Sequence, residues 1–178
     1  METYRITKKD LDKNNRYVGK LDLSDLDGNL EADESLGYVL VDRIVAKGYI
    51  YFKAGSGIKA GEGIKAGSGI EAGEGIKAGE GIKAGWGIEA GEGITCKLSL
   101  SFGYRLFAGL CIWKKEVTDA EKTITCGKLE KGTIVYGILK ETGLPDEKKA
   151  NVAKDKAQEL EDEATKLLAK AKELRESL

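Results

Sequence analysis

A six-residue repeat constrains this chain more than any other feature. From Ala54 to Ile94 the sequence repeats Ala-Gly-x-Gly-Ile-x, with Ser, Glu or Trp at the first variable position and mostly Lys or Glu at the second. Two glycines per unit would cost a helix about 2 kcal/mol relative to alanine. A flexible glycine-rich linker would have no reason to place Ile at every sixth position. The repeat therefore predicts ordered β-structure.

Each unit is interpreted as a three-residue strand followed by a turn. In an Ile-x-Ala strand the two apolar side chains point to one side and the middle residue points to the other. Gly-x-Gly would supply the turn, because glycine adopts positive φ at little cost. One unit cannot bury its own Ile, so stacked units should form a coil around an apolar column. The predicted structural core is Ile58, Ile64, Ile70, Ile76, Ile82, Ile88 and Ile94.

The charges favour two hexads in each turn of the coil. If three hexads formed a turn, Lys59 would stack on Lys77 and Glu71 on Glu89. Like charges directly opposite each other are unfavourable, by a few tenths of a kcal/mol up to about 1 kcal/mol. If two hexads formed a turn, Lys59, Glu71 and Lys83 would alternate in sign. We therefore predict a two-sided coil.

The regions around the repeat complete a mainly β fold class. Residues 1–20 are a polar lead-in, and residues 21–142 are expected to form a short parallel β-solenoid with strict hexads at 54–94. Alternating apolar residues continue through 95–140 and predict a capping β region that closes the solenoid. Residues 146–178 are predicted to form a C-terminal α-helix.

The C-terminal helix is predicted from a regular heptad pattern of a coiled-coil type. Its apolar residues recur at alternating spacings of three and four, which places them on one seam. The seam packs on the solenoid of the same chain, or it binds a protein partner or a second copy; both interpretations stay open. The seam residues are Ala150, Ala153, Ala157, Leu160, Ala164, Leu167, Ala171, Leu174 and Leu178.

Composition excludes several classes of function. The 178 residues carry a net charge of −1, which argues against a nucleic-acid surface. No run is long and apolar enough for a membrane span, and the start of the sequence has no secretory leader. The three cysteines, Cys96, Cys111 and Cys126, are an odd and sparse set that suits a reducing compartment. We therefore expect a cytoplasmic protein.

The sequence shows no constellation of catalytic, cofactor-binding or metal-binding residues. Histidine is absent, and the glycine-rich stretch lacks the P-loop pattern. Asp25, Asp27, Gly28 and Glu34 match part of a calcium loop, but Leu23 stands at its first ligand position. We interpret these carboxylates as solvated turn residues. The cysteines lack a C-x-x-C pair, so a zinc site is not expected either.

Trp86 is the one candidate partner-binding residue. It occupies a turn position that Ser or Glu holds in the other hexads. An exposed Trp can anchor a protein partner. The alternative, which we favour from sequence, is that Trp86 packs under a loop or under the C-terminal helix.

The hexads resemble Gly-Ile-Ala-rich β-solenoids, a group that includes bactofilin-like polymer-forming proteins and uncharacterised phage and bacterial repeat proteins. The regularity is also compatible with a designed sequence. The hexads are similar, too, to those of the hexapeptide-repeat acyltransferases. In that family a small residue stands four positions after the aliphatic one, where this chain has Glu62 after Ile58, and a histidine serves as base. Both departures count against that activity.

These observations predict a non-catalytic structural or protein-interaction scaffold that is not an enzyme and needs no cofactor. The absence of catalytic groups is also compatible with an alternative, a phage-type inhibitor or decoy that binds a host defence protein. A hexapeptide-repeat transferase is the third and least favoured hypothesis.

Overall fold

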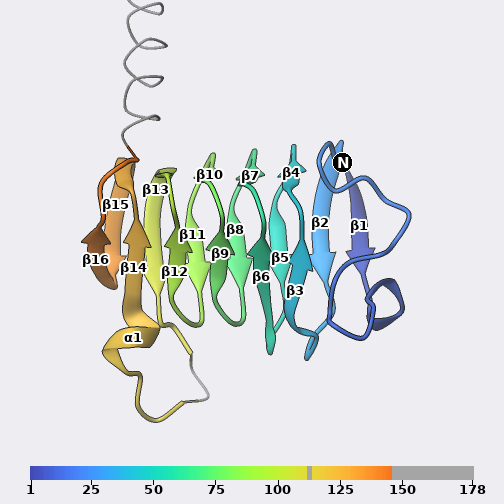
Figure 1. The fold of residues 1–178 in the computed structure, drawn as a ribbon, viewed down its shortest axis with the longest axis horizontal. Coiled ribbons are helices and arrows are strands. Elements are labelled where there is room, and N and C mark those ends of the chain that lie inside the picture. Colours follow the sequence, from blue (N-terminus) through green and yellow to red (C-terminus); the bar gives the residue numbers. More distant parts are fainter. Residues whose placement is uncertain (112–113, 146–178) are drawn as a thin grey trace, which may run out of the picture. The chain divides into compact units, whose positions relative to one another are not determined.

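A computed structural model describes residues 1–111 and 114–145 (Figure 1). The chain divides into two compact units, Met1–Gly143 and Leu144–Leu178, and the first is described below. It is a parallel β-solenoid of about six turns, which confirms the predicted mainly β fold class. The predicted helix at 146–178 lies outside the described residues.

The strands follow one another along the chain with short corners between them. The N-terminal elements are β1 (Glu2–Ile6), a 3-10 turn (Lys8–Asp10), β2 (Gly28–Ala32) and β3 (Gly37–Val41). The central strands are β4 (Ile44–Ala46), β5 (Ile50–Phe52), β6 (Ser56–Ala60), β7 (Ile64–Ala66), β8 (Ile70–Ala72), β9 (Ile76–Ala78), β10 (Ile82–Ala84), β11 (Ile88–Ala90) and β12 (Ile94–Cys96). The C-terminal elements are β13 (Ser99–Ala108), α1 (Asp119–Lys122), β14 (Thr123–Cys126), β15 (Lys128–Tyr136) and β16 (Ile138–Glu141).

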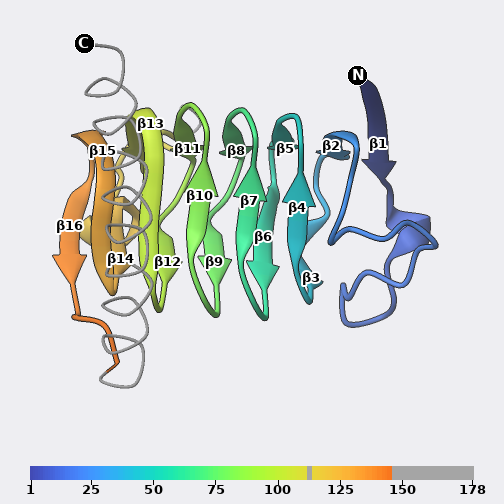
Figure 2. The same ribbon diagram turned by 90° about the horizontal axis from the view of Figure 1, so that it is seen from above.

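Three strands form each revolution of the coil, which we call a rung. One face stacks β1, β2, β5, β8 and β11, a second stacks β4, β7 and β10, and the third stacks β3, β6, β9, β12, β14 and β16. The long strand β13 turns a corner and pairs with both β10 and β11. Successive rungs lie side by side along the axis in Figures 1 and 2.

The prediction of two hexads per turn is wrong. Ile64 pairs with Ile82, so residues eighteen positions apart are neighbours and three hexads form each rung. The charge pattern was expected to keep like charges apart, but the same strand pairing places Lys65 beside Lys83.

Charge is a weak guide to the register because each ladder of like charges is short and exposed. The ladder of Lys65 and Lys83 ends in Val45 on one side and Ser101 on the other. Water screens such exposed charges, so the repulsion is small compared with the about 1.5–3 kcal/mol that burial of one Ile side chain contributes. The charge ladders therefore do not decide the register.

Most of the repeat glycines are needed because neighbouring rungs approach each other closely. Positive φ, the reason predicted from sequence, is wrong for all but one of them. Among them Gly55 alone has a positive φ, of 69°. A Cβ atom on Gly79 would lie 1.9 Å from the carbonyl oxygen of Gly61, and a Cβ on Gly85 equally close to that of Gly67. No side chain fits at such a distance.

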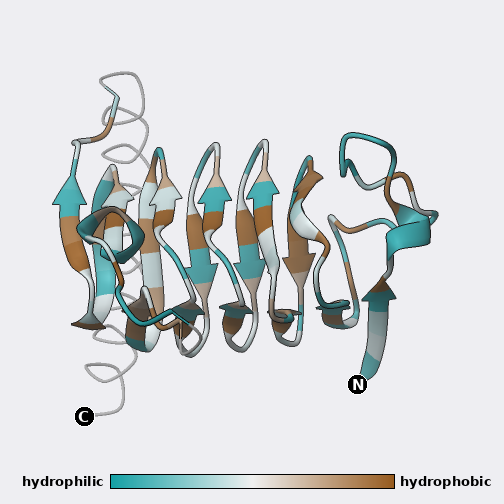
Figure 3. Ribbon diagram, turned by 90° about the horizontal axis from the view of Figure 1, so that it is seen from below, coloured by the Kyte–Doolittle hydropathy of each residue, from teal (hydrophilic) through white to brown (hydrophobic). Residues whose placement is uncertain are grey.

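The core is a column of aliphatic side chains inside the coil. All seven isoleucines of the predicted series are 0–1% exposed, and the alanines two positions later are also buried. In Figure 3 the hydrophobic segments recur at the same place in successive strands. Phe52 and Phe102 are buried where the hexads meet the less regular rungs before and after them.

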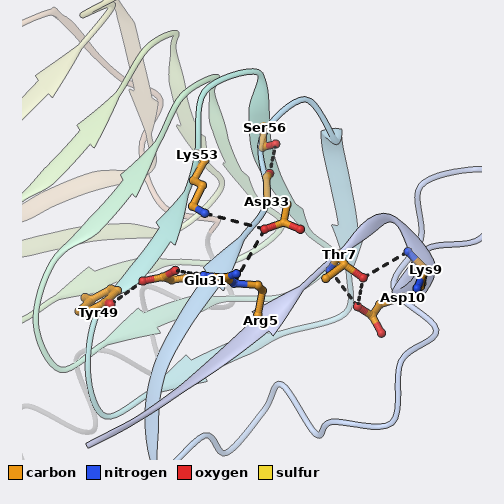
Figure 4. A network of polar contacts seen from close by, with 9 residues as sticks. All are labelled: Arg5, Thr7, Lys9, Asp10, Glu31, Asp33, Tyr49, Lys53 and Ser56. Carbon is orange, nitrogen blue, oxygen red and sulfur yellow. Dashed lines mark hydrogen bonds and ion pairs between the residues drawn. The ribbon is translucent and has the colours of Figure 1, made fainter.

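The N-terminal end of the coil is held by a polar network (Figure 4). The predicted lead-in contributes β1, which pairs in parallel with β2. Arg5 donates to Glu31 at 3.4 Å and lies 3.8 Å from a carboxylate oxygen of Asp33, as does Lys53. The hydroxyl of Ser56, which is fully buried, donates to the carbonyl oxygen of Asp33 at 2.7 Å.

The C-terminal end differs, because its last strands are exposed. Strands β13 to β16 continue the stack, with β15 paired to β13 and β16 to β14. Every residue of β16 is exposed. Within the described residues no further strand pairs with β15 or β16. The exposed apolar side chains here include Val135, Tyr136, Ile138 and Leu139.

Candidate binding trough

One face of the coil carries a trough of about 620 Å³. It lies over β5, β8, β11 and the second half of β13, which we call the trough face. Five aromatic side chains line it, although the whole chain has only seven Tyr, three Phe and two Trp. The five are Tyr49, Tyr51, Trp86, Tyr104 and Phe107.

The first wall of the trough rises from a corner of the coil. The amide of Trp86 donates to the carbonyl oxygen of Ser68 at 3.1 Å, and the amide of Tyr104 donates to that of Trp86 at 2.9 Å. These hydrogen bonds stack the three corner residues on successive rungs. Trp86 is 62% exposed and Tyr104 is 68% exposed, so the wall presents two large rings to solvent.

The second wall consists of the outward-pointing residues at the middle of each strand. Tyr51 pairs with Glu71, Glu71 with Glu89, and Glu89 with Phe107. Two carboxylates on neighbouring strands thus stand between two aromatic rings. Neighbouring strands in a sheet are about 4.8 Å apart, which sets the spacing of these side chains along the wall.

Between the walls the floor of the trough is built from small residues. Gly69 and Gly87 line it where a larger residue would fill the space between the walls. Their neighbours Ile70 and Ile88 point inward and are 1% exposed. The absence of side chains on the two glycines leaves the trough open along its length.

The two ends of the trough have different chemistry. At the N-terminal end the Tyr49 hydroxyl donates to Glu31 at 2.7 Å, and Glu31 also accepts from Arg5, which ties Tyr49 to the polar network of Figure 4. At the C-terminal end the lining residues include Arg105, which pairs in β13 with Thr133 of β15.

The electrostatics of the trough are dominated by Glu71 and Glu89. Partial burial raises the pKa of Glu71, and the neighbouring Glu89 raises it further. Burial likewise raises the pKa of Tyr51, with smaller contributions from Glu71 and Glu31. Neither Glu71 nor Glu89 forms a salt bridge or hydrogen bond in the described part of the chain. The trough is therefore an aromatic surface that carries two unpaired carboxylates.

Trp86, the candidate partner-binding residue, lies at this trough. Its exposure shows that it does not pack under a loop of the described part, which was one of the two packings favoured from sequence. The other, packing under the C-terminal helix, involves residues outside those described. The sequence reasoning missed Tyr104, Glu71, Glu89 and Phe107 as its neighbours. The sequence contains a signal that could have found them, namely a spacing of eighteen residues. This spacing separates Trp86 from Tyr104 and Glu71 from Glu89, so a coil of three hexads per turn places each pair side by side.

Three other residues that the sequence singled out, Asp27, Cys96 and Cys126, have structural roles. Asp27 forms an ion pair with Lys47 at 2.9 Å. Cys96 and Cys126 are buried side by side on β12 and β14, and burial raises the pKa of their thiols to about 12 and about 11. Among residues 1–111 and 114–145 no group of three or more acidic, histidine or cysteine side chains is placed to hold a metal ion.

Comparison of the chain with protein-family models, with curated proteins and with solved structures finds no significant match. In the described part of the chain no helix is both long and apolar enough to cross a membrane.

Proposed function

We propose that this protein is a non-catalytic scaffold that binds a protein partner through the trough face. The observation that carries the proposal is the exposed pair of aromatic rings, Trp86 and Tyr104, beside a trough of about 620 Å³. Aromatic residues that stand exposed around a concave site are typical anchors for partner binding. The coil beneath them is fixed by buried Ile side chains and inter-rung hydrogen bonds, so the trough is formed before a partner arrives.

Site-specific photo-cross-linking tests this proposal. A photoreactive amino acid replaces Trp86 in one variant and Lys59, on the face formed by β3, β6 and β9, in a control variant. We expect a discrete cross-linked protein in cells at position 86 and none at position 59. Equal products at both positions, or none at either, would refute the proposal.

The identity of the cross-linked protein separates the scaffold hypotheses. A host defence protein would favour the inhibitor alternative, and a structural component of the cell would favour a scaffold in the narrower sense. A product of two identical chains would instead assign the trough to self-association, as in the polymer-forming β-solenoids that the hexads resemble.

A further inference from the structure

No cation of the described part of the chain is paired with Glu71 or Glu89. Asp27 and Glu92, by contrast, lie 2.9 Å and 3.0 Å from Lys47 and Lys114. Like charges on neighbouring strands repel each other, so the free protein holds Glu71 and Glu89 at a cost. A cation bound between them would relieve that repulsion.

The aromatic surroundings select among cations. Trp86 and Tyr104 line the same trough as the two carboxylates, and Tyr51 and Phe107 flank those carboxylates along the second wall. A guanidinium group is planar, stacks on aromatic faces and donates to two carboxylate oxygens at once. An ammonium group is a compact, strongly hydrated charge that lacks this fork.

We infer that the trough binds an arginine side chain, presented by an extended segment of a separate protein partner, with its guanidinium between Glu71 and Glu89 and against the ring of Trp86. This inference rests on the proposed function and names the chemistry of the partner. Glu71 and Glu89 are directly paired on neighbouring strands, which are about 4.8 Å apart. Successive same-side residues of a bound strand are about 6.6 Å apart, so two of its side chains would not match this spacing and one shared guanidinium matches it better.

Arg105 provides an internal check on the inference. It is exposed, lines the same trough, and is the one basic residue among the lining residues. Its positive charge in the trough would oppose the binding of a partner's guanidinium. Removal of that charge should therefore strengthen binding of an arginine ligand, whereas removal of either carboxylate should weaken it.

Peptide titrations monitored by NMR test the inference on the full chain. The probes are blocked pentapeptides Gly-Gly-X-Gly-Gly in which X is arginine, lysine or citrulline, and the readout is the indole signal of Trp86. Citrulline keeps the shape of arginine without its charge. We expect arginine to bind about ten-fold more tightly than citrulline, since charge-assisted pairs are roughly twice as strong as neutral ones, and more tightly than lysine.

Matched variants locate the effect. Glu71→Gln and Glu89→Gln should each weaken arginine binding several-fold, and Arg105→Gln should strengthen it. Glu62→Gln removes the same charge at an exposed corner outside the trough, where Glu62 faces Arg43 at 3.8 Å, and should change the affinity by less than two-fold. The exposed positions of these side chains let the amide variants fold, which their NMR spectra will verify.

The outcomes separate this inference from the proposed function. Equal affinity for arginine and citrulline, a preference for lysine, or an unchanged affinity in Glu71→Gln and Glu89→Gln would overturn the inference. If cross-linking at position 86 still yields a partner in that case, the proposed function stands with another ligand chemistry. Absence of both peptide binding and cross-linking would overturn both.

Discussion

Glycine at the first position of most Gly-x-Gly corners allows one rung to lie directly on the next, although a Cβ atom on Gly61 would meet its nearest neighbour only at 3.7 Å. A Cβ atom at Gly79 would approach the carbonyl oxygen of Gly61 to 1.9 Å, whereas a Cβ at Gly69, a second-position glycine, would lie 3.4 Å from that of Gly87. Gly79 and Gly69 thus differ in how closely the neighbouring rung approaches them. The sequence, in which both recur with the same period, does not distinguish them.

Alanine substitutions test this difference. Gly79→Ala should destabilise the protein by about 3 kcal/mol, because the rungs must separate to admit the methyl group. Gly69→Ala is the matched control, and it should change the free energy of unfolding by less than about 1 kcal/mol. Urea denaturation measures both. Equal effects of the two substitutions would show that close approach between rungs is not what the first glycine provides.

At the scale of elements, the excursion between β13 and β14 departs from the regular coil. It carries α1, which Thr118 caps by accepting from the amide of Glu121 while the Glu121 carboxylate accepts from Thr118. The ammonium group of Lys114 donates to Glu92 at 3.0 Å and also to Glu121. Because Glu92 is in the last corner of the repeat, Lys114 fastens the excursion to the coil.

The titration of Glu121 tests this attachment. Hydrogen bonds from Lys114 and from Thr118 lower the pKa of Glu121 from 4.5 to about 2. A lowered pKa in the folded state means that the ionised carboxylate stabilises the attachment above pH 4.5, and that this contribution is lost as the pH falls towards 2. We expect an NMR titration midpoint near 2 that rises in Lys114→Gln.

Lys115→Gln is the control for that titration, since it removes the neighbouring charge and leaves the hydrogen bonds to Glu121 in place. Its midpoint should remain near that of the unmodified protein. A midpoint close to 4.5 in the unmodified protein would contradict the attachment through Lys114.

At the scale of the whole molecule, the sequence predicts the type of fold better than its register. The recurrence of Ile at every sixth residue is enough to predict a parallel β-solenoid with an Ile column. It is not enough to predict three hexads per rung, because stacking at twelve or at eighteen residues places Ile on Ile equally well. The site depends on that choice. Stacking at twelve would put Trp86 beside Glu74, whereas stacking at eighteen puts it beside Ser68 and Tyr104.

The most direct test of the three-hexad coil is the removal of repeats. Deletion of residues 61–78 joins Ala60 to Gly79 and removes β7, β8 and β9, one strand from each face. Every later strand, β13 included, then stays on the same face as the N-terminal strands that it follows in the full chain. Deletion of 61–72 also preserves the hexad pattern, but it removes strands from only two of the three faces. Every later strand, together with β13 and the excursion, then moves to another face relative to the N-terminal strands. We predict cooperative unfolding of the longer deletion, with the shorter one less stable by about 3 kcal/mol or more in urea. Greater stability of the twelve-residue deletion would contradict the three-hexad coil and the trough that it assembles.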